Sequence, residues 1–528
     1  MLQCAFSACV LAATLAAGLA TDEVKSLPGW SGALPSRHWS GYLGTLGNRS
    51  LHYYFAESEG DPATDPVVLW VQGGPGGSSM EGFFTEVGPF SLNELSMPAG
   101  AAAAPTLFPN PYGWTRNASV LAWESPAGVG FSPCGGADDP AAACPHWNDT
   151  SSAVDNAAFL CAFFRAFPAF RAQPFFIAGE SYAGVYIPMV SAALIDQGLE
   201  CPAVPPPAAA AAFKVPLAGV AIGNGCTGTA VGPCAPARGQ NTLDFLLRHG
   251  LASTPATAAV TAACADSAAL TKPSPACMAA VRKVSAEVGP YLSYDVYDSC
   301  ADAAGHSEFA GHLCGWIPNS AWCDGEDRAA GGEYPRERAE LTVGVGGGGA
   351  AQAAAAAVAL PPPTPGPAAN VCGCDAALAA YLSRADVQIA MNVLPAASAA
   401  SPYPWPGGRS AHKWQYTRTE PDLVGYVPKL LAAGVRVLIY SGDFDGQIPT
   451  AGSEAWTRSL GIEAREPWHA WSAVGAAGSG PVAGSVLRYN TSVEFSLLTI
   501  RGAGHMAPRY KPLESFAMIE RFLAGTPY

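Results

Sequence analysis

Short apolar runs recur along this chain and alternate with stretches of helical periodicity. Helix patterns extend from Asp155 to Phe167 and from Tyr182 to Gln197. Six runs have the length of strands that are covered on both faces, at residues 67–71, 120–123, 175–178, 220–222, 435–440 and 495–500. This alternation predicts an α/β fold built on an open, mostly parallel sheet.

The composition supports a large core and excludes one class of ligand. Of the 528 residues, 49% are hydrophobic, which excludes global disorder. The 28 lysines and arginines are outnumbered by 42 aspartates and glutamates, for a formal net charge of −14. Because nucleic-acid binding relies on a basic surface, we expect no nucleic-acid partner.

The first twenty residues have the pattern of a secretory signal peptide. An apolar run is centred on residues 10–15, and residues 18–20 place small side chains at the cleavage position, although no Lys or Arg precedes the run. A buried N-terminal helix is the alternative. The run is too short for a membrane span, and no later stretch reaches about 18 uninterrupted apolar residues. We therefore expect an exported chain without a membrane span.

Cysteines and glycosylation sequons agree with export. Cys4 and Cys9 lie in the predicted signal peptide, so 13 of the 15 cysteines remain in a chain expected to mature where disulfides form. Four Asn-x-Ser/Thr sequons are candidates for N-glycosylation, at Asn48, Asn117, Asn148 and Asn490. We predict passage through the secretory pathway, with the protein secreted or delivered to a vacuole or lysosome.

A cysteine-rich stretch interrupts the alternation of strands and helices. From Gly225 to Cys374 the strand pattern stops and cysteines crowd together, which predicts an inserted, disulfide-rich cap subdomain. Within it, residues 344–367 are nearly all Gly, Ala and Pro and cannot bury enough apolar surface to fold, so we expect an exposed, protease-sensitive loop. The predicted organisation is a signal peptide at 1–20, a core in two parts at 21–225 and 375–528, and the cap at 226–374.

The strongest local signal surrounds Ser181. Phe175 to Ala178 has the composition of a strand, Gly179 to Gly184 (GESYAG) that of a tight turn, and a helix pattern follows. Such an element, with small residues on both sides of a serine, is typical of a nucleophile elbow, which presents the hydroxyl at the top of a sheet. The usual pattern is G-x-S-x-G, and here Ala183 takes the last position. An ordinary turn serine is the alternative interpretation.

Candidate partners for Ser181 occur later in the chain. A serine hydroxyl becomes an effective nucleophile only when a base removes its proton and an acid orients that base. In elbow enzymes these partners follow in the order serine, acid, histidine, after later strands. Asp443 and Asp445 follow the strand predicted at 435–440, and His505 follows the last predicted strand in a turn of small residues. A solvated loop histidine is the alternative for His505.

A glycine-rich turn is a candidate oxyanion hole. Gln72 to Gly77 (QGGPGG) follows the strand predicted at 67–71, and glycines let backbone N–H groups point into a site without a side chain in the way. The N–H groups of Gly74 and Tyr182 are the expected pair of donors. A tight turn without function is one alternative. A phosphate-binding loop is another, disfavoured because no Lys-Ser/Thr pair follows the glycines.

Together these motifs resemble the serine carboxypeptidase family over nearly the whole mature chain. The resemblance implies an α/β-hydrolase fold with an inserted cap. It also implies a serine-type carboxypeptidase that releases C-terminal residues from peptides at acid pH, without a metal or cofactor. The segments that carry it, in family order, are Ser40–Tyr42, Asp65–Phe90, Asn110–Ser132, Gly179–Gly184, Gly219–Gly225, Tyr381–Val387, Tyr440–Pro449 and Gly502–Pro508.

The resemblance assigns catalytic roles to individual residues. It makes Ser181 the nucleophile and His505 the base. The acid is Asp445, the second aspartate of the GDFD run, which leaves Asp443 as a structural turn residue.

The resemblance places substrate recognition at Glu180, Glu124 and Gln72. Glu180 matches the family's carboxyl group that hydrogen-bonds the substrate's free C-terminus, and Glu124, in the WESPAG segment, matches its hydrogen-bonded neighbour. Ionising two adjacent carboxyl groups together is unfavourable, because their charges repel each other. One of them therefore keeps its proton into mildly acid pH and can donate to a substrate carboxylate. Selection of a free C-terminus and a preference for acid pH would follow from this pair.

The chain departs from the family pattern at two positions of the glycine-rich turn. Gln72 stands where the family usually has Asn, so the amide donor sits on a longer stem and substrate binding is expected to be shifted or weakened. Gly77 stands where the family usually has a bridged Cys, which leaves Cys372 or Cys374 unpaired or paired differently. Cys161, on an apolar helix, is expected to be a buried free thiol.

Two other functions stay open on the sequence alone. An acyltransferase would use the same triad to pass an acyl group from an activated ester to an alcohol, and the departure at Gln72 lends it some support. A binding or protective protein would keep the fold without the chemistry, although all three triad positions are present. The expected partners are peptide or protein C-termini, and a homodimer is left open.

Overall fold

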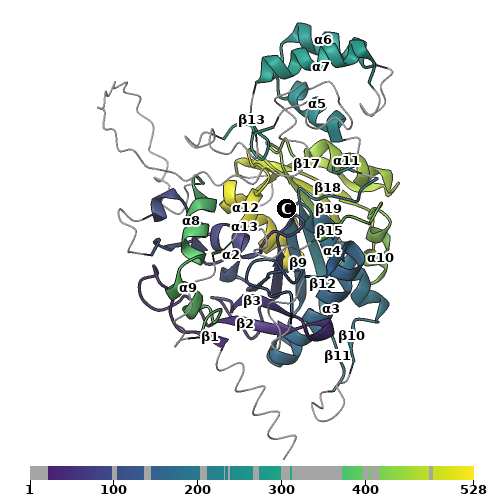
Figure 1. The fold of residues 1–528 in the computed structure, drawn as a ribbon. Coiled ribbons are helices and arrows are strands. Elements are labelled where there is room, and N and C mark those ends of the chain that lie inside the picture. Colours follow the sequence, from purple (N-terminus) through teal and green to yellow (C-terminus); the bar gives the residue numbers. More distant parts are fainter. Residues whose placement is uncertain are drawn as a thin grey trace, which may run out of the picture.

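An eleven-stranded mixed β-sheet forms the centre of the molecule in the computed structural model (Figure 1). The structure describes residues 22–97, 104–135, 144–202, 211–230, 232–235, 238–265, 273–289, 291–298, 310–311, 371–395, 404–405, 415–474 and 480–528. In spatial order the strands are β1 (Glu23–Val24), β2 (His38–Gly44), β3 (Ser50–Ala56), β7 (Ser119–Trp123), β4 (Val67–Val71), β9 (Phe175–Glu180), β12 (Leu217–Gly223), β16 (Arg436–Gly442), β19 (Phe495–Ile500), β18 (Val482–Tyr489) and β17 (Ala464–Ser472).

The six central strands pair in parallel and are the six that the apolar runs predict. Side by side, their order is β7, β4, β9, β12, β16 and β19. Their side chains are buried almost throughout, because helices cover both faces of the sheet. The predicted α/β fold is therefore confirmed, and the predicted parallel strands form the centre of a sheet that is mixed as a whole.

Antiparallel strands extend the sheet at both ends, and the apolar-run pattern does not detect them. β1, β2 and β3 lie beyond β7, and β18 and β17 lie beyond β19. Polar residues such as His38 and Ser40 interrupt β2, and most of β17 is exposed. A strand with polar residues in its sequence has no continuous apolar run, so its signal is weak.

Helices cover both faces of the sheet, with a separate hydrophobic core on each face. Because side chains alternate across a strand, Ile177 of β9 enters one core and Ala178 enters the other. The first core holds α3 (Asp149–Ala166), α4 (Ala183–Asp196), α10 (Tyr426–Ala432) and α11 (Thr450–Ser459). The second core holds α2 (Met80–Thr85), α8 (Cys374–Leu382), α9 (Ala385–Ala390), α12 (Ala507–Tyr510) and α13 (Pro512–Ala524).

Three further helices form a smaller unit with a hydrophobic core of its own. Leu246, Val260 and Val281 belong to this core and to neither of the other two. The unit stands apart from the sheet in Figure 1 and lies within the predicted cap at 226–374. The division into domains stays a prediction, and the loop at 344–367 lies outside the described residues, as does the predicted signal peptide. The helices are α5 (Arg238–Arg248), α6 (Thr254–Ala263) and α7 (Pro275–Val288).

Short elements connect these layers. The strand pairs are β5 (Phe90–Ser91) with β6 (Phe108–Pro109), β8 (His146–Asn148) with β15 (Gln415–Thr417), β10 (Glu200–Cys201) with β11 (Phe213–Lys214), and β13 (Tyr291–Leu292) with β14 (Ala310–Gly311). The 3-10 helices are η1 (Leu46–Asn48), η2 (Glu94–Ser96), η3 (Trp114–Arg116) and η4 (Pro168–Ala172).

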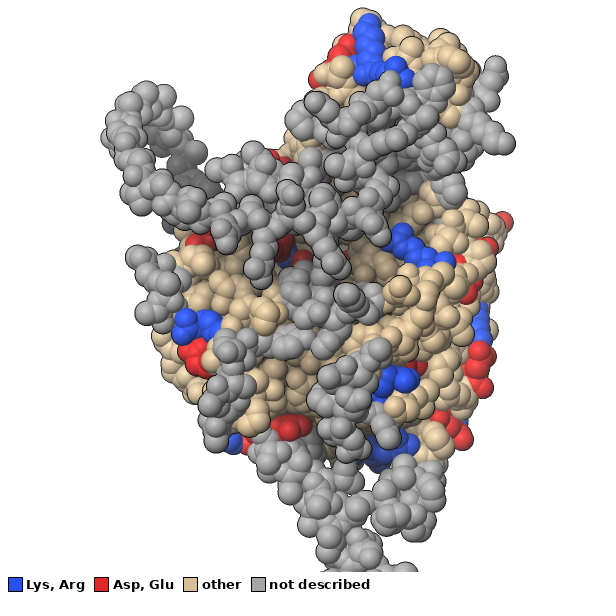
Figure 2. Space-filling model, in the orientation of Figure 1, with Lys and Arg blue, Asp and Glu red and all other residues tan. Residues whose placement is uncertain are grey.

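The described surface gives two further observations. Figure 2 shows lysines and arginines scattered singly among acidic residues and broad uncharged areas on this face. Across the parts of the chain that the structure describes, none of the helices combines the length and the apolar character that a bilayer crossing requires.

Four disulfides lie within the described residues, and one of them corrects the prediction for Cys161. The prediction of a free thiol there is wrong, because β10 brings Cys201 against α3, a pairing that a sequence separation of 40 does not reveal. Cys372 is also disulfide-bonded, whereas Cys374 is free and buried. The four bonds are Cys134–Cys144, Cys161–Cys201, Cys226–Cys234 and Cys264–Cys277.

The candidate glycosylation asparagines differ in how the fold holds them. Asn490 is exposed. The side-chain oxygen of Asn148 caps α3 by accepting from Ser151 N at 2.8 Å, and the side-chain amide of Asn117 donates to a glutamate of α13 at 2.7 Å. The side chain of Asn48 lies outside the described residues. Of the described sequons, Asn490 therefore has the most accessible amide, and glycosylation of all four stays a prediction.

We predict that the Cys161–Cys201 bond stabilises the core beside α4. The double variant Cys161→Ala/Cys201→Ala should lose about 2–4 kcal/mol of unfolding free energy, because the loop closed by this bond gains freedom in the unfolded chain. Denaturant unfolding followed by tryptophan fluorescence measures the loss. Cys374→Ala removes a buried thiol that forms no disulfide and only a hydrogen bond to Val371 O, and it is the matched control. Equal losses in the two variants would contradict the prediction.

Candidate active site

Ser181 occupies a strained turn between β9 and α4. Its φ is 62°, in the left-handed region that residues with a β-carbon rarely adopt. The Ser181 N–H donates to Gly223 O, and the Ser181 carbonyl accepts from Gly184 N and Cys226 N, each at 3.0 Å. The side chain is partly exposed. This is the geometry of a nucleophile elbow, and hydrogen bonds to β12 and to the segment after it maintain the strain.

Two glycines let neighbouring segments approach this turn closely. A β-carbon on Gly179 would lie 2.1 Å from Val71 O, and one on Gly73 would lie 2.6 Å from the β-carbon of Ser181. Contacts this short would force the backbone apart, so both positions require glycine. The loop after β4 consequently lies directly against the nucleophile turn.

The predicted oxyanion donors belong to these two adjacent loops. Tyr182 follows Ser181, and Gly74 follows Gly73, where an added β-carbon would lie 2.5 Å from Tyr182 N. Within the described part of the chain, neither the Gly74 nor the Tyr182 N–H donates to a backbone carbonyl. Two free N–H groups close to a serine hydroxyl can stabilise an oxyanion that develops on a bound carbonyl.

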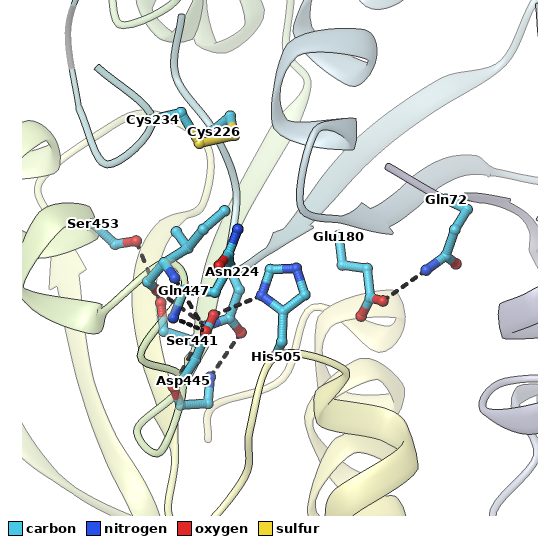
Figure 3. A network of polar contacts seen from close by, with 12 residues as sticks. Gln72, Glu180, Asn224, Cys226, Cys234, Ser441, Asp445, Gln447, Ser453 and His505 are labelled. Carbon is cyan, nitrogen blue, oxygen red and sulfur yellow. Dashed lines mark hydrogen bonds and ion pairs between the residues drawn. A yellow bond between two sulfur atoms is a disulfide. The ribbon is translucent and has the colours of Figure 1, made fainter. Parts of the chain in front are cut away.

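His505 and Asp445 meet beyond the ends of β19 and β16. The His505 Nδ1–H donates to Asp445 Oδ2 at 2.7 Å, and both side chains are buried (Figure 3). A carboxylate at Nδ1 selects the tautomer in which Nε2 can act as a base. Nε2 is buried and has no hydrogen-bond partner among the described residues, so it is not bonded to Ser181 here. Such contacts are often long before substrate binds.

Besides His505, three donors hold the Asp445 carboxylate. Asn224 Nδ2 donates to Oδ2 at 2.7 Å, and the N–H groups of Gln447 and Ile448 donate to Oδ1 at 2.7 and 3.1 Å. These bonds compensate for the cost of burying a charge. Sequence reasoning did not assign Asn224 a role. Its signal was its position directly after a buried parallel strand, at the edge of the sheet where functional side chains gather.

Tyr294 packs against the ring of His505. The two rings stack, with centroids 4.5 Å apart and an angle of 12° between their planes. The backbone N–H of His505 also donates to the backbone carbonyl of Tyr294 at 2.6 Å. Tyr294 lies in the cysteine-rich stretch, which has no motif that points to it. This stretch therefore supplies a residue that holds the histidine, and it is more than a cover over the site.

Asp443 is bonded to the loop that carries His505, but not to the histidine ring. Its Oδ1 accepts from Gly502 N at 2.6 Å. Burial raises the pKa of its carboxyl group, and the hydrogen bond from Gly502 opposes that shift. Of the two candidate aspartates, only Asp445 contacts His505 in the described structure.

Gln72 and Glu180 form a buried pair beside the nucleophile. Trp70 Nε1, which can only donate, bonds Gln72 Oε1 at 2.9 Å, so the Gln72 NH₂ group must face Glu180. Gln72 Nε2 donates to Glu180 Oε1 at 2.8 Å (Figure 3). The longer stem of Gln72 therefore still delivers an amide donor to the site.

Glu124 is not the neighbour of Glu180, which corrects the expected pair. Its Oε1 accepts from Ser78 Oγ, and its Oε2 accepts from Phe131 N at 2.7 Å and lies 3.0 Å from His52 Nδ1. Glu180 Oε2, in contrast, has no hydrogen-bond partner among the described residues. Glu124 instead ties the loop after β7 to β3 and to the segment before α2, an arrangement that motif position alone does not reveal.

Glu86 is the carboxyl group that acts on Glu180. Glu86 is buried at the end of α2, and neither of its carboxyl oxygens has a hydrogen-bond partner among the described residues. Burial raises the pKa of Glu86 to about 8, opposed by Arg509 and supported by Glu81. Burial, then Glu86 and Glu81, raise the pKa of Glu180 well above its usual range. A glutamate within the apolar run FFTEVGPF was the available sequence signal.

These features together define an α/β hydrolase: a sheet with a parallel centre, a serine elbow after a central strand, and a histidine–aspartate pair after two later strands. A family model described as serine carboxypeptidase matches residues 28–525, and the chain belongs to this family. Serine carboxypeptidase 1 of Hordeum vulgare is 32% identical over 96% of this chain and 93% of its own length. The lysosomal protective protein of Mus musculus is 31% identical, over 96% and 94%.

A solved structure supports the fold independently. Kex1(delta)p, a prohormone-processing carboxypeptidase from Saccharomyces cerevisiae, superposes with a TM-score of 0.61 over 96% of each chain, at 17% identity. The α/β-hydrolase fold expected from the resemblance is therefore confirmed.

We predict that the two aspartates after β16 differ sharply in catalysis. Asp445→Asn should lower kcat for an activated ester by about 10⁴-fold, because the histidine loses the acceptor that sets its tautomer. Asp443→Asn should lower kcat by less than about 10-fold, since among the described residues the Asp443 side chain bonds the Gly502 backbone and not the His505 ring. Circular dichroism confirms that both variants fold. The reverse ranking would transfer the acid role to Asp443.

Proposed function

We propose that this protein is a serine-type carboxypeptidase that releases C-terminal residues from peptides and proteins at acid pH. The observation that carries this proposal is a pair of buried carboxyl groups with raised pKa values, one of which directly precedes the nucleophile. The free C-terminal carboxylate of a peptide is the ligand that such a pair can select.

The chemical step follows the serine hydrolase scheme. His505 Nε2 takes the proton of Ser181 Oγ as this oxygen attacks the scissile carbonyl. The N–H groups of Gly74 and Tyr182 stabilise the oxyanion. His505 then gives the proton to the leaving amine, which departs as the released C-terminal residue. Water, deprotonated by the same histidine, hydrolyses the ester on Ser181, and Asp445 stabilises the imidazolium in both half-reactions.

Glu180 and Glu86 supply the selectivity for a free C-terminus. Three of their four carboxyl oxygens have no hydrogen-bond partner among the described residues, and Gln72 holds the fourth. A protonated carboxyl group donates a hydrogen bond to a carboxylate, whereas an ionised one repels it. Because Glu180 precedes Ser181 in sequence, a C-terminus bound there leaves the last peptide bond near the hydroxyl.

The pH dependence follows from the direction of these shifts. Both pKa values are raised, so the pair is protonated at acid pH and binds the substrate carboxylate there. As pH rises through these pKa values, about 8 for Glu86, the pair ionises and binding weakens. The Michaelis constant for peptides should therefore increase with pH, while the substrate carboxylate itself stays ionised.

The cellular setting is part of the same proposal. A predicted signal peptide, four disulfides among the described residues and an exposed sequon support entry into the secretory pathway. One relative is named for the lysosome. An acid compartment such as a lysosome or vacuole, or the exterior of the cell, is where a peptidase with this pH dependence would act on peptide C-termini.

The direct test is release of C-terminal residues from a peptide library, read by mass spectrometry. The wild-type protein should shorten peptides from the C-terminus and leave C-terminally amidated peptides largely intact at acid pH. Ser181→Ala should lose activity by about 10⁴–10⁶-fold in kcat, because the nucleophile is absent. Acyl transfer from an activated ester to an alcohol, with no peptide hydrolysis, would replace this proposal with the acyltransferase.

We predict that Glu86 and Glu180, but not Glu124, control the pH dependence of peptide binding. Glu86→Gln or Glu180→Gln removes one ionisation, so the Michaelis constant for a blocked dipeptide should vary less between pH 5 and 9. The cost at acid pH should be about 1–3 kcal/mol, the value of one hydrogen bond to a charged group. Steady-state kinetics at each pH, compared with the dipeptide amide, measure this.

Glu124→Gln is the matched control for these two variants. It should lower thermal stability, since a buried carboxyl group with several donors is replaced, and it should keep the wild-type pH profile. A flattened profile in Glu124→Gln alone would restore the pair that the sequence motif suggested.

A further inference from the structure

A buried arginine joins three helices beside the carboxyl pair. Arg509 lies in α12, four residues after His505, and its side chain is only 6% exposed. Its Nη2 donates to Glu81 Oε1 at 3.2 Å and to Thr85 Oγ1 at 3.0 Å, both on α2. Its Nη1 donates to Asp375 Oδ1, on α8, at 3.2 Å. The guanidinium is therefore held in one orientation from two sides.

This network is continuous with the carboxyl pair. Glu81 lies in the first turn of α2 and Glu86 caps its C-terminal end, where the Glu86 N–H donates to Gly82 O at 2.9 Å, so Arg509 and Glu86 are attached to the same short helix. Arg509 Nε is buried without a hydrogen-bond partner among the described residues, as are both Glu86 oxygens. The cation is fixed close to a carboxyl group that it does not neutralise by direct contact.

The titratable groups around Glu86 and its network come from five elements. Arg509 carries the positive charge that acts on Glu86, and the acidic groups Glu81 and Asp375 act in the opposite direction. A single cation that already contacts two carboxylates can only partly offset the cost of ionising a third. The other titratable groups that act on the pair or its network are Glu81 on α2, Glu180 on β9, Asp375 and Cys374 on α8, and Tyr440 on β16.

We propose that Arg509 is a positioning residue whose fixed charge sets the pH at which the Glu86–Glu180 pair ionises and releases the substrate's C-terminus. The proposal rests on the proposed carboxypeptidase function, because it assigns a purpose to the same pair. Arg509 attracts the ionised form of Glu86, and Glu81, held against the guanidinium, repels it. The balance between these two opposite charges gives the enzyme its upper pH limit.

The two charges predict shifts of opposite sign. Without Arg509 the pair keeps its proton to higher pH, so Arg509→Gln should move the rise in the peptide Michaelis constant upward by about one pH unit. Without Glu81 the attraction of Arg509 is less opposed, so Glu81→Gln should move it downward by a similar amount. Arg509→Lys keeps the charge and should leave the profile within a few tenths of a unit. General destabilisation would not produce opposite shifts.

The kinetic experiment measures the Michaelis constant for a blocked dipeptide, and for its amide, from pH 5 to 10 in each variant. The amide should show none of these shifts, because it presents no carboxylate. Arg521→Gln is the matched control, since Arg521 is a partly buried arginine of α13 that donates to Ser472 O and lies outside this network. Coincident profiles for wild type and Arg509→Gln, or shifts in the same direction for Arg509→Gln and Glu81→Gln, would overturn the proposal.

A titration without turnover separates this proposal from the proposed function. In a Ser181→Ala background, infrared difference spectroscopy follows the C=O stretch of protonated carboxyl groups, and Glu86→Gln identifies the Glu86 band. Arg509→Gln should move the midpoint of that band upward, and Glu81→Gln should move it downward. If the wild-type protein released no C-terminal residues, the proposed carboxypeptidase function would be refuted. An unmoved Glu86 midpoint in Arg509→Gln would refute the role of Arg509, whatever the substrate.

Discussion

The left-handed backbone at Ser181 is the constraint on which the rest of the site depends. A non-glycine residue keeps this conformation only when its surroundings enforce it, and here β12 and the segment after it supply the hydrogen bonds. The turn also needs close neighbours without side chains, which explains the glycines at 73 and 179. The same contacts place Gly73, the residue before Gly74, against Ser181. The strain at Ser181 and the close approach of the glycine-rich turn are thus parts of one arrangement.

Three buried carboxyl groups show how environment decides function. Asp445 receives three donors and orients a histidine. Glu124 is also satisfied by donors, and it joins segments of the fold. Glu86 is buried with no hydrogen-bond partner among the described residues, so its pKa is raised to about 8 and its neutral form is favoured. Residues of nearly the same chemistry therefore differ in the contacts they make and, for Glu86, in the role we propose, according to the donors around them.

The site draws on parts of the chain that lie far apart. Tyr294, from the cysteine-rich stretch, stacks on His505, and Arg509, four residues after His505, is hydrogen-bonded to α8 and α2. The carboxyl end of β9 carries Glu180, and Ser181 follows it directly, so the two proposed roles fall on neighbouring residues. Substitutions at supporting residues such as Tyr294 and Arg509 are therefore expected to affect the chemistry of the site.

Local sequence determined the parallel strands, the serine elbow, and the order of serine, aspartate and histidine, because each depends on residues that are contiguous or that follow a predicted strand. It could not decide which glutamate acts on Glu180, since Glu86 and Glu124 are both remote from it in sequence and only the placement of the helix α2 and the loop after β7 in space separates them. It also could not place Asn224, Tyr294 or the Cys161–Cys201 bond. Those relations arise from packing between segments that are distant in sequence, and only the tertiary structure sets the donors and the burial that give each carboxyl group its role.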